Sequence, residues 1–205
     1  MAPRQTRTVE VPEITIAHEL TLPARESALV VVDMQNDFVR PEGALVVPDA
    51  PATVRPVAEL LARARDARVR VAYTQDTHFQ GDREWEIWPP HCRRESWGWK
   101  IIDELAPRPA ELVVEKHRYD GFYGTSLEHY LLNVWHIRDL IVVGTVANIC
   151  VLHTAGSAGL RWLRVVVPAD CLSAQTPFDH VLTLRQISWL YAGVVMDQAA
   201  DVRFT

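Results

Sequence analysis

Residues 27–33 decide the fold, and they read Ser-Ala-Leu-Val-Val-Val-Asp. The five residues between Ser27 and Asp33 are all apolar, and three of them are β-branched, so neither face of the segment is polar. Such a run is typical of a strand that is buried on both faces of a parallel sheet. We therefore predict a central strand here, with the Asp33 carboxylate at its carboxyl end.

The rest of the chain alternates between helical and strand patterns. Residues 52–68 repeat apolar side chains at helical spacing, and residues 69–74 form a second strand-like run. Further strands are expected at 112–114, 140–144, 165–167 and 193–195, and further helices at 127–135, 148–161 and 178–190. Strands separated by helices of this length predict an α/β fold. We expect a three-layer sandwich, with helices on both faces of a mostly parallel sheet.

The composition fits one globular domain. The chain has 205 residues, of which 48% are hydrophobic, and a chain of this size forms a core without disulfide bonds. We predict a single domain over residues 1–205. Residues 1–26 lie outside the alternation and are expected to form an N-terminal arm.

Charge and cysteine content indicate the setting and exclude some partners. The net charge is −5 and the arginines are scattered, which argues against nucleic acid because phosphate binding relies on clustered Lys and Arg. No apolar run approaches the roughly 18 residues that a membrane span needs, so no membrane partner is expected. Three cysteines, an odd number, and the absence of a charged-then-apolar leader predict a reducing, cytoplasmic setting.

Polar residues stand at the predicted carboxyl ends of the strands, where ligands bind in parallel sheets. They are Asp33, Asp76 with His78, Lys116, and Cys150 at the start of a helix. Each alone has a structural explanation: a helix cap for Asp33, a surface lysine for Lys116, a small buried apolar residue for Cys150. Their joint placement at one edge of one sheet favours a functional site.

A thiol, an ammonium and a carboxylate are the parts of a nucleophilic hydrolase. A helix N-terminus and a nearby lysine are expected to lower the pKa of the Cys150 thiol. The carboxylate accepts the thiol proton and returns it to a leaving nitrogen. Backbone N–H groups of the turn at residues 144–150 are placed to stabilise an acyl oxyanion.

A second cluster lies in the long segment of residues 75–109, which holds four of the seven tryptophans. A loop of that length in a compact domain is usually functional. Asp76, His78 and His91 are donors that suit Zn²⁺, Mn²⁺ or Fe²⁺, although two histidines near an aspartate also occur by coincidence. We interpret Cys92, beside His91, as a buried thiol and not as a further ligand.

Four blocks together resemble the isochorismatase-like cysteine hydrolase superfamily, and within it the metal-containing nicotinamidases. They are Val-Val-Asp-Met-Gln-Asn-Asp-Phe (31–38), Gln-Asp-Thr-His (75–78) with Trp-Pro-Pro-His-Cys (88–92), Lys-His-Arg-Tyr-Asp-Gly-Phe-Tyr-Gly-Thr (116–125), and Val-Gly-Thr-Val-Ala-Asn-Ile-Cys-Val (143–151). They occur in family order over roughly residues 27–160. The combination is highly specific, although no single block is.

The resemblance implies a six-stranded, mostly parallel sheet, a cis peptide near Thr145–Val146, and a homo-oligomer, because relatives are commonly dimers or tetramers. It also implies roles for individual residues: a catalytic triad of Asp33, Lys116 and Cys150; an oxyanion hole from the N–H groups of Val146 and Cys150; a divalent metal on Asp76, His78 and His91; and substrate contacts from Phe38, Trp88, Tyr119 and Asn148.

Two departures from the nicotinamidase pattern concern the substrate. Nicotinamidases usually read Gly-x-Ala-Thr-Asp/Glu-x-Cys, whereas Asn148 here is more typical of the broader amidohydrolase relatives. Some nicotinamidases have an additional histidine after the Asp-x-His motif, where this chain offers Asp82, Glu84 and Glu86.

These observations predict a cysteine-dependent amidohydrolase that converts nicotinamide and water to nicotinate and ammonia through a thioester. Three alternatives stay open. They are a family hydrolase acting on an N-carbamoyl, ureido or other aromatic amide, an isochorismatase that cleaves a vinyl ether, and a non-catalytic interaction protein.

Overall fold

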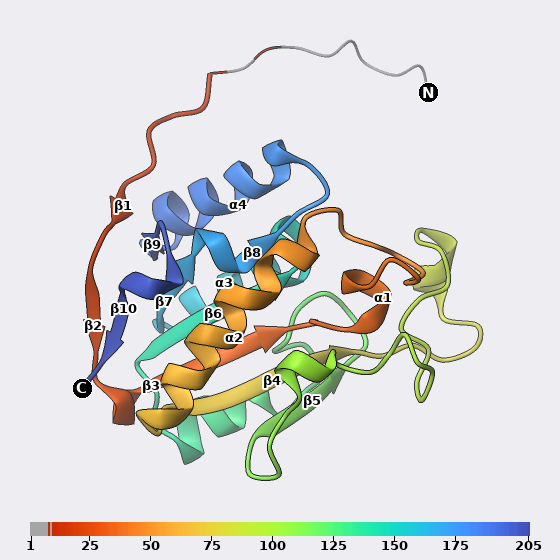
Figure 1. Cartoon of the computed structure of the whole chain (residues 1–205), viewed down its shortest axis with the longest axis horizontal. Helices are drawn as coiled ribbons and strands as arrows, with labels where there is room; N and C mark the ends of the chain where they lie inside the picture. The colour runs from red at the N-terminus through yellow and green to blue at the C-terminus, as the bar shows by residue number, and fades with distance from the viewer. Residues whose placement is uncertain (1–7, 9) are drawn as a thin grey trace.

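A parallel sheet forms the centre of the computed structural model, which describes residue 8 and residues 10–205 (Figure 1). Eight strands run in the order β1–β9–β7–β6–β3–β4–β5, with β8 also paired to β6, and every pair is parallel. They are β1 (Ile16–Ala17), β3 (Ser27–Val32), β4 (Arg70–Asp76), β5 (Leu112–Lys116), β6 (Asp139–Thr145), β7 (Arg164–Pro168), β8 (Leu172–Ser173) and β9 (Val194–Met196).

The α/β prediction is confirmed, and the expected number of strands is corrected. All six strands predicted from apolar runs are present, with β3 central and fully buried. The sheet has eight strands and not six because β1 and β8 add two residues each. A two-residue strand is too short to show an apolar pattern, so the sequence does not predict it.

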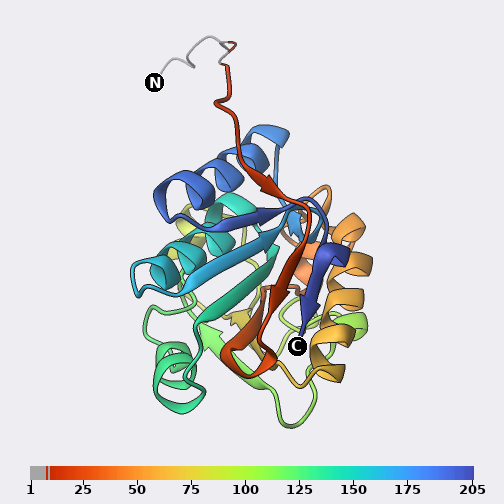
Figure 2. The same ribbon diagram turned by 90° about the vertical axis from the view of Figure 1, so that its left-hand side faces the viewer.

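Helices cover both faces of the sheet, as Figure 2 shows. On one face α2 (Ala50–Asp66) packs against Leu29 and Val31, and on the other η5 (Ala147–Val151), α3 (Leu152–Gly159) and α4 (Pro177–Leu190) pack against Val30 and Val32. Successive residues of a strand point to opposite faces, so an uninterrupted apolar run serves two cores at once. This explains why residues 28–32 carry no polar side chain.

The remaining helices are short. They are η1 (Ala24–Glu26), α1 (Asn36–Val39), η2 (Arg83–Glu86), η3 (Asp103–Leu105), η4 (His129–Val134), η6 (Ala169–Cys171) and η7 (Ala199–Asp201). Among them η4 is π-helical, as is η5 described above. The predicted helices at 127–135 and 148–161 therefore exist, each with a π-helical portion.

Residues 16–22 of the predicted N-terminal arm pair with strands of this same chain. Its strand β1 pairs with β9, and β2 (Leu20–Leu22) pairs with β10 (Val202–Phe204) in a separate two-stranded sheet. Residues 1–7 and 9 of the predicted arm lie outside the described residues. No helix in the described part of the chain is both long enough and apolar enough to cross a bilayer.

The loop after β4 and helix α1 lie beyond the arrowhead of β3, at the carboxyl edge of the sheet (Figure 1). Gln35 fixes this arrangement. Its side-chain amide donates to the carbonyls of Asp76 (2.9 Å) and Trp99 (2.8 Å), and its Oε1 accepts from Asp76 N (2.8 Å). One buried side chain therefore joins the end of β3, the end of β4 and the loop.

Gly144 tests how closely β3 and β6 approach. Its φ is +119°, and an added Cβ would lie 2.1 Å from the Val32 carbonyl oxygen. Gly124 also has positive φ (+68°), but nothing lies within 4 Å of its added Cβ.

We expect Gly124→Ala to lower the free energy of unfolding by about 1–2 kcal/mol through backbone strain, and Gly144→Ala to lower it by roughly 1–3 kcal/mol more through the clash. Urea denaturation of both variants measures this, and equal losses would contradict the close approach.

Candidate active site

The three residues of the predicted triad meet at the carboxyl edge of the sheet. Asp33 follows β3, Lys116 ends β5, and Cys150 lies in η5 after β6. Lys116 Nζ lies 2.8 Å from Asp33 Oδ2 and 3.5 Å from Cys150 Sγ. Asp33 and Lys116 are completely buried, and Cys150 is 5% exposed. The ammonium of Lys116 thus contacts both the carboxylate and the thiol.

Lys116 also pairs with a second carboxylate, that of Asp76, at 2.8 Å from Oδ1. Burial disfavours the ammonium, but Asp33 and Asp76 together raise the pKa of Lys116 well above its usual value. Burial also acts on Asp76, yet Lys116 and hydrogen bonds from His78 and His91 hold the pKa of that carboxyl well below its usual range. Lys116 and Asp76 are therefore both charged at neutral pH.

Asp33 differs from Asp76. Burial raises the pKa of the Asp33 carboxyl, against the pull of Lys116. A carboxylate is a better proton acceptor when its pKa is raised towards the working pH. Of the two carboxylates beside Lys116, Asp33 is therefore the one suited to take and return a proton.

The prediction for Cys150 was wrong in direction. The sequence predicts a lowered pKa for the thiol, whereas burial raises it well above its usual value and outweighs the favourable charge of Lys116. The carboxylates of Asp33 and Asp76 raise it further. Cys150 is consequently a thiol at neutral pH and needs a base to become a nucleophile.

Asp76, His78 and His91 also come together, and they fit a divalent cation. All three are buried, and one ligand atom from each lies within 4.8 Å of the others. The Nε2 atoms of His78 and His91 are 3.0 Å and 3.3 Å from Asp76 Oδ2. Ligands about 2.0–2.1 Å from a tetrahedral ion are separated by a little over 3 Å, and the two distances from Asp76 to the histidines match that separation.

Neighbouring groups orient both histidines. The Nδ1 of His78 contacts Asp82 Oδ2 at 2.9 Å, and the Nδ1 of His91 contacts the Pro89 carbonyl at 2.7 Å. When Nδ1 donates, the lone pair is on Nε2, which is how metal-binding histidines are usually held. In both residues Nε2 faces Asp76 Oδ2, so a metal ion there would bind the Nε2 lone pair in place of the hydrogen bond to Asp76.

The three acidic residues of the loop have different surroundings. Asp82 holds His78, as described, and Glu86 is exposed. Glu84 is buried, its Oε1 lies 3.9 Å from His78 Nε2, and its Oε2 has no hydrogen-bond partner. Glu84 is therefore a further oxygen donor beside the cluster. Its signal in the sequence is its position six residues after His78.

A narrow pocket connects the thiol and the metal cluster. Its walls include three of the four predicted substrate contacts, Phe38, Trp88 and Tyr119, together with Leu45, Asp76, Glu84, His91, Val146, Ile149, Cys150 and Gln175. Trp88 Nε1 donates to the Tyr119 hydroxyl at 3.1 Å. The cavity of about 20 Å³ has room for about one water molecule, so we expect Trp88 and Tyr119 to move apart when a substrate enters.

Asn148, the fourth predicted contact, does not line this pocket. Its Nδ2 donates to Asp179 Oδ1 at 3.0 Å, at the start of α4. Leu45, Ile149 and Gln175 were not predicted. Each reaches the pocket through loop or helix geometry that no spacing in the sequence indicates.

The peptide bond between Thr145 and Val146 is cis, as the resemblance implied. Val146 and Cys150 both line the pocket and lie on the same turn. Their assignment as the oxyanion hole stays a prediction.

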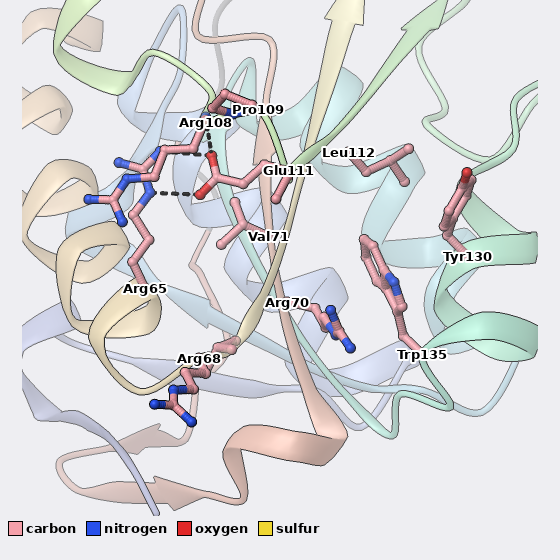
Figure 3. Close-up of a pocket in the computed structure, with 12 residues that line it drawn as sticks. Arg65, Arg68, Arg70, Val71, Arg108, Pro109, Glu111, Leu112, Tyr130 and Trp135 are labelled. Carbon is pink, nitrogen blue, oxygen red and sulfur yellow. Dashed lines mark hydrogen bonds and ion pairs between the residues drawn. The ribbon is translucent and has the colours of Figure 1, made fainter.

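A larger cavity of about 440 Å³ lies at the opposite edge of the sheet and contains none of the predicted site residues (Figure 3). Its arginines point to different sides of β4. Arg65 is paired with Glu111 at 2.7 Å on one side, and Arg70 lies near Trp135 on the other. The predicted site residues therefore line the narrow pocket and not the larger cavity.

Comparison with known proteins agrees with this geometry. The Isochorismatase domain family matches residues 27–200. An N-carbamoylsarcosine amidase structure from Thermoplasma acidophilum is 35% identical, with a TM-score of 0.77, over 85% of this chain and 96% of that one. A nicotinamidase structure from Bacillus subtilis is 26% identical, with a TM-score of 0.79, over 84% and 100%. A ureidoacrylate amidohydrolase from Serratia proteamaculans is 32% identical over 85% of each chain.

We expect the purified protein to bind about one divalent ion per chain at Asp76, His78 and His91. Burial disfavours the charged ring, but Asp76 and Asp82 raise the pKa of His78 to about 9. The ion must displace that proton, so its affinity should rise from about pH 6 to about pH 8. Mass spectrometry of bound metal after dialysis against Zn²⁺ measures the loss in His91→Ala. The exposed His129 of η4, as His129→Ala, is the control. Equal metal content in wild type and His91→Ala would contradict the site.

Proposed function

This chain is an amidohydrolase of the isochorismatase family, and we propose that its substrate is a small heteroaromatic carboxamide, nicotinamide being the one to test first. The products are then nicotinate and ammonia, and the intermediate is a thioester on Cys150. The observation that carries the proposal is the complete Asp76, His78 and His91 cluster, two members of which, Asp76 and His91, line the pocket that holds the thiol.

The aromatic walls support a flat substrate. Phe38 lies with its ring centroid 5.7 Å from that of His91, and Trp88 stands across the same pocket. A divalent ion held by the cluster would supply a Lewis acid for a pyridine nitrogen, which orients the ring. In that orientation the carboxamide carbon would face Cys150, which lines the same pocket.

Acylation uses three groups of the chain. The Cys150 thiol gives its proton to Asp33 as sulfur attacks the amide carbon, and the carbon–sulfur bond forms while the carbonyl π electrons move to oxygen. The N–H groups of Val146 and Cys150 stabilise this oxyanion. When the intermediate collapses, the carbon–nitrogen bond breaks and protonated Asp33 returns the proton to nitrogen, which leaves as ammonia.

Deacylation repeats the same transfers with water. Asp33 takes a proton from water, the hydroxide attacks the thioester carbon, and the carbon–sulfur bond breaks. Sulfur then recovers the proton from Asp33, and the acid is released. The charge of Lys116, 2.8 Å from Asp33 and 3.5 Å from the sulfur, stabilises both groups when they are anionic.

A second candidate is hydrolysis of a ureido or N-carbamoyl amide. It is favoured by the higher identity to the N-carbamoylsarcosine amidase (35%) than to the nicotinamidase (26%). Asn148, which departs from the nicotinamidase pattern, agrees with it. This reaction predicts turnover that survives removal of the metal.

Two further properties belong to the proposal. A homodimer or homotetramer in the cytoplasm is consistent with the family, and the three unpaired thiols suit a reducing compartment.

We expect wild type to release ammonia from nicotinamide, Cys150→Ala to lose at least about 10³-fold in kcat, and chelation of the metal to raise KM strongly. Cys171→Ala, which removes a buried thiol away from the pocket, is the matched control and should retain activity. Ammonia release is assayed in parallel with a panel of ureido and N-carbamoyl amides. Equal rates for wild type and Cys150→Ala would exclude the thiol mechanism, and turnover of ureido amides alone, unaffected by chelation, would select the second candidate.

A further inference from the structure

The geometry points to Thr74 as the residue that positions the catalytic base. This inference rests on the proposed role of Asp33 as the proton acceptor. Thr74 lies on β4, next to β3, and is completely buried. Its hydroxyl donates to Asp33 Oδ1 at 2.7 Å, and its carbonyl oxygen accepts from Asp33 N at 3.2 Å. One residue therefore holds both the backbone and the side chain of the base.

The backbone of Asp33 explains why such support is needed. Asp33 has a φ of +50°, a left-handed conformation that costs a residue with a Cβ some conformational energy. It follows the last residue of β3, and its backbone hydrogen bond to the Thr74 carbonyl does not by itself fix its side chain. The contacts to Thr74 and Lys116 are what determine where the carboxylate points.

The two oxygens of the Asp33 carboxylate have different partners. Oδ1 accepts from Thr74, whereas Oδ2 is paired with Lys116 at 2.8 Å and accepts no other hydrogen bond. Because Lys116 Nζ also lies 3.5 Å from Cys150 Sγ, Oδ2 is the carboxylate oxygen on the side of the thiol, and it presents a lone pair for the thiol proton. If Oδ1 lost its donor, the carboxylate could rotate and withdraw that lone pair from Cys150.

The Thr74 methyl group fixes the direction of its hydroxyl. An added Cβ at Gly121 would come within 2.9 Å of Thr74 Cγ2 and 3.2 Å of Thr154 Cγ2, so the methyl is closely packed on that side. With the methyl held there, the hydroxyl faces Asp33. A β-branched residue has few alternative rotamers, which makes threonine better suited to this position than serine.

The test compares Thr74→Val and Thr74→Ala, which remove the hydroxyl, with Thr74→Ser, which retains it. The matched control is Thr53→Val, because Thr53 is a buried threonine of α2 whose hydroxyl donates to the Ala50 carbonyl at 2.8 Å, away from the pocket. We expect kcat to fall about 10- to 100-fold in Thr74→Val and Thr74→Ala, with KM changed less than about threefold. Thr74→Ser should stay within about threefold of wild type, and Thr53→Val should keep wild-type kcat.

A second readout does not depend on which amide is the substrate. It is the pH profile of Cys150 alkylation by iodoacetamide. A hydrogen bond to the charged form of a carboxyl lowers its pKa, so losing Thr74 should raise the pKa of Asp33 and move the acid limb of the profile to higher pH. The charged or titratable groups near Asp33 are Lys116, Asp76, Cys150 and Cys92, and none of them is altered in these variants.

The outcomes separate the two proposals. A shifted alkylation profile in Thr74→Val and Thr74→Ala, absent from Thr74→Ser and Thr53→Val, supports the positioning role even if nicotinamide is not hydrolysed. An unshifted profile, or a loss of kcat in Thr74→Val no larger than in Thr53→Val, would overturn it. So would a Thr74→Ser variant as impaired as Thr74→Val.

Discussion

The buried ammonium of Lys116, shared by two carboxylates, is the interaction on which the rest of the site depends. Its Nζ lies 2.8 Å from Asp33 Oδ2 and 2.8 Å from Asp76 Oδ1, and its side chain is 0% exposed. Removing an ion from water costs several kcal/mol even after relaxation, so none of the three charges would persist here alone. In the proposed mechanism Asp33 transfers the proton, and Asp76 belongs to the candidate metal cluster. One cation therefore neutralises a carboxylate in each of the two groups and allows both to be buried side by side.

Sheet order brings these three groups together. β3, β4 and β5 are consecutive neighbours, and Asp33, Asp76 and Lys116 stand at or just after their carboxyl ends. Cys150 arrives from β6, the neighbour of β3 on its other side. A thiol with a raised pKa then needs a base held at a defined angle, and β4 supplies that control through Thr74. The same strand ends in Asp76 and leads to His78, so β4 contributes to both halves of the chemistry.

The sequence predicted what depends on local pattern. Six strands were predicted from apolar runs. Asp33, Asp76, Lys116 and Cys150 were predicted as site residues because they follow these strands, and parallel strands bring their carboxyl ends to one edge of the sheet. It did not predict what depends on the balance of opposing forces. Burial raises the pKa of Cys150 and the charge of Lys116 lowers it. The spacing of residues in the sequence does not show how deeply the thiol is buried. Asn148 pairs with Asp179, which is 31 positions away, and neither residue carries a signal of that contact. β1 and β8 are too short for a period to exist.

The free energy of unfolding of Lys116→Met, measured against pH beside wild type, tests the central role of Lys116 most directly. Without the cation, Asp33 is buried with no charged partner, so its folded-state pKa rises further above the unfolded one and stability falls as pH rises, whereas Asp76 keeps its contacts to His78 and His91 but loses its strongest partner. In wild type, Lys116 limits the rise in the pKa of Asp33, and the depressed pKa of Asp76 gives the opposite slope, with stability lost as pH falls. We predict that Lys116→Met is less stable by about 3–5 kcal/mol at neutral pH and that the deficit shrinks towards about pH 5. A variant as stable as wild type, with the same pH dependence, would contradict the view that one buried ammonium holds the two carboxylates together.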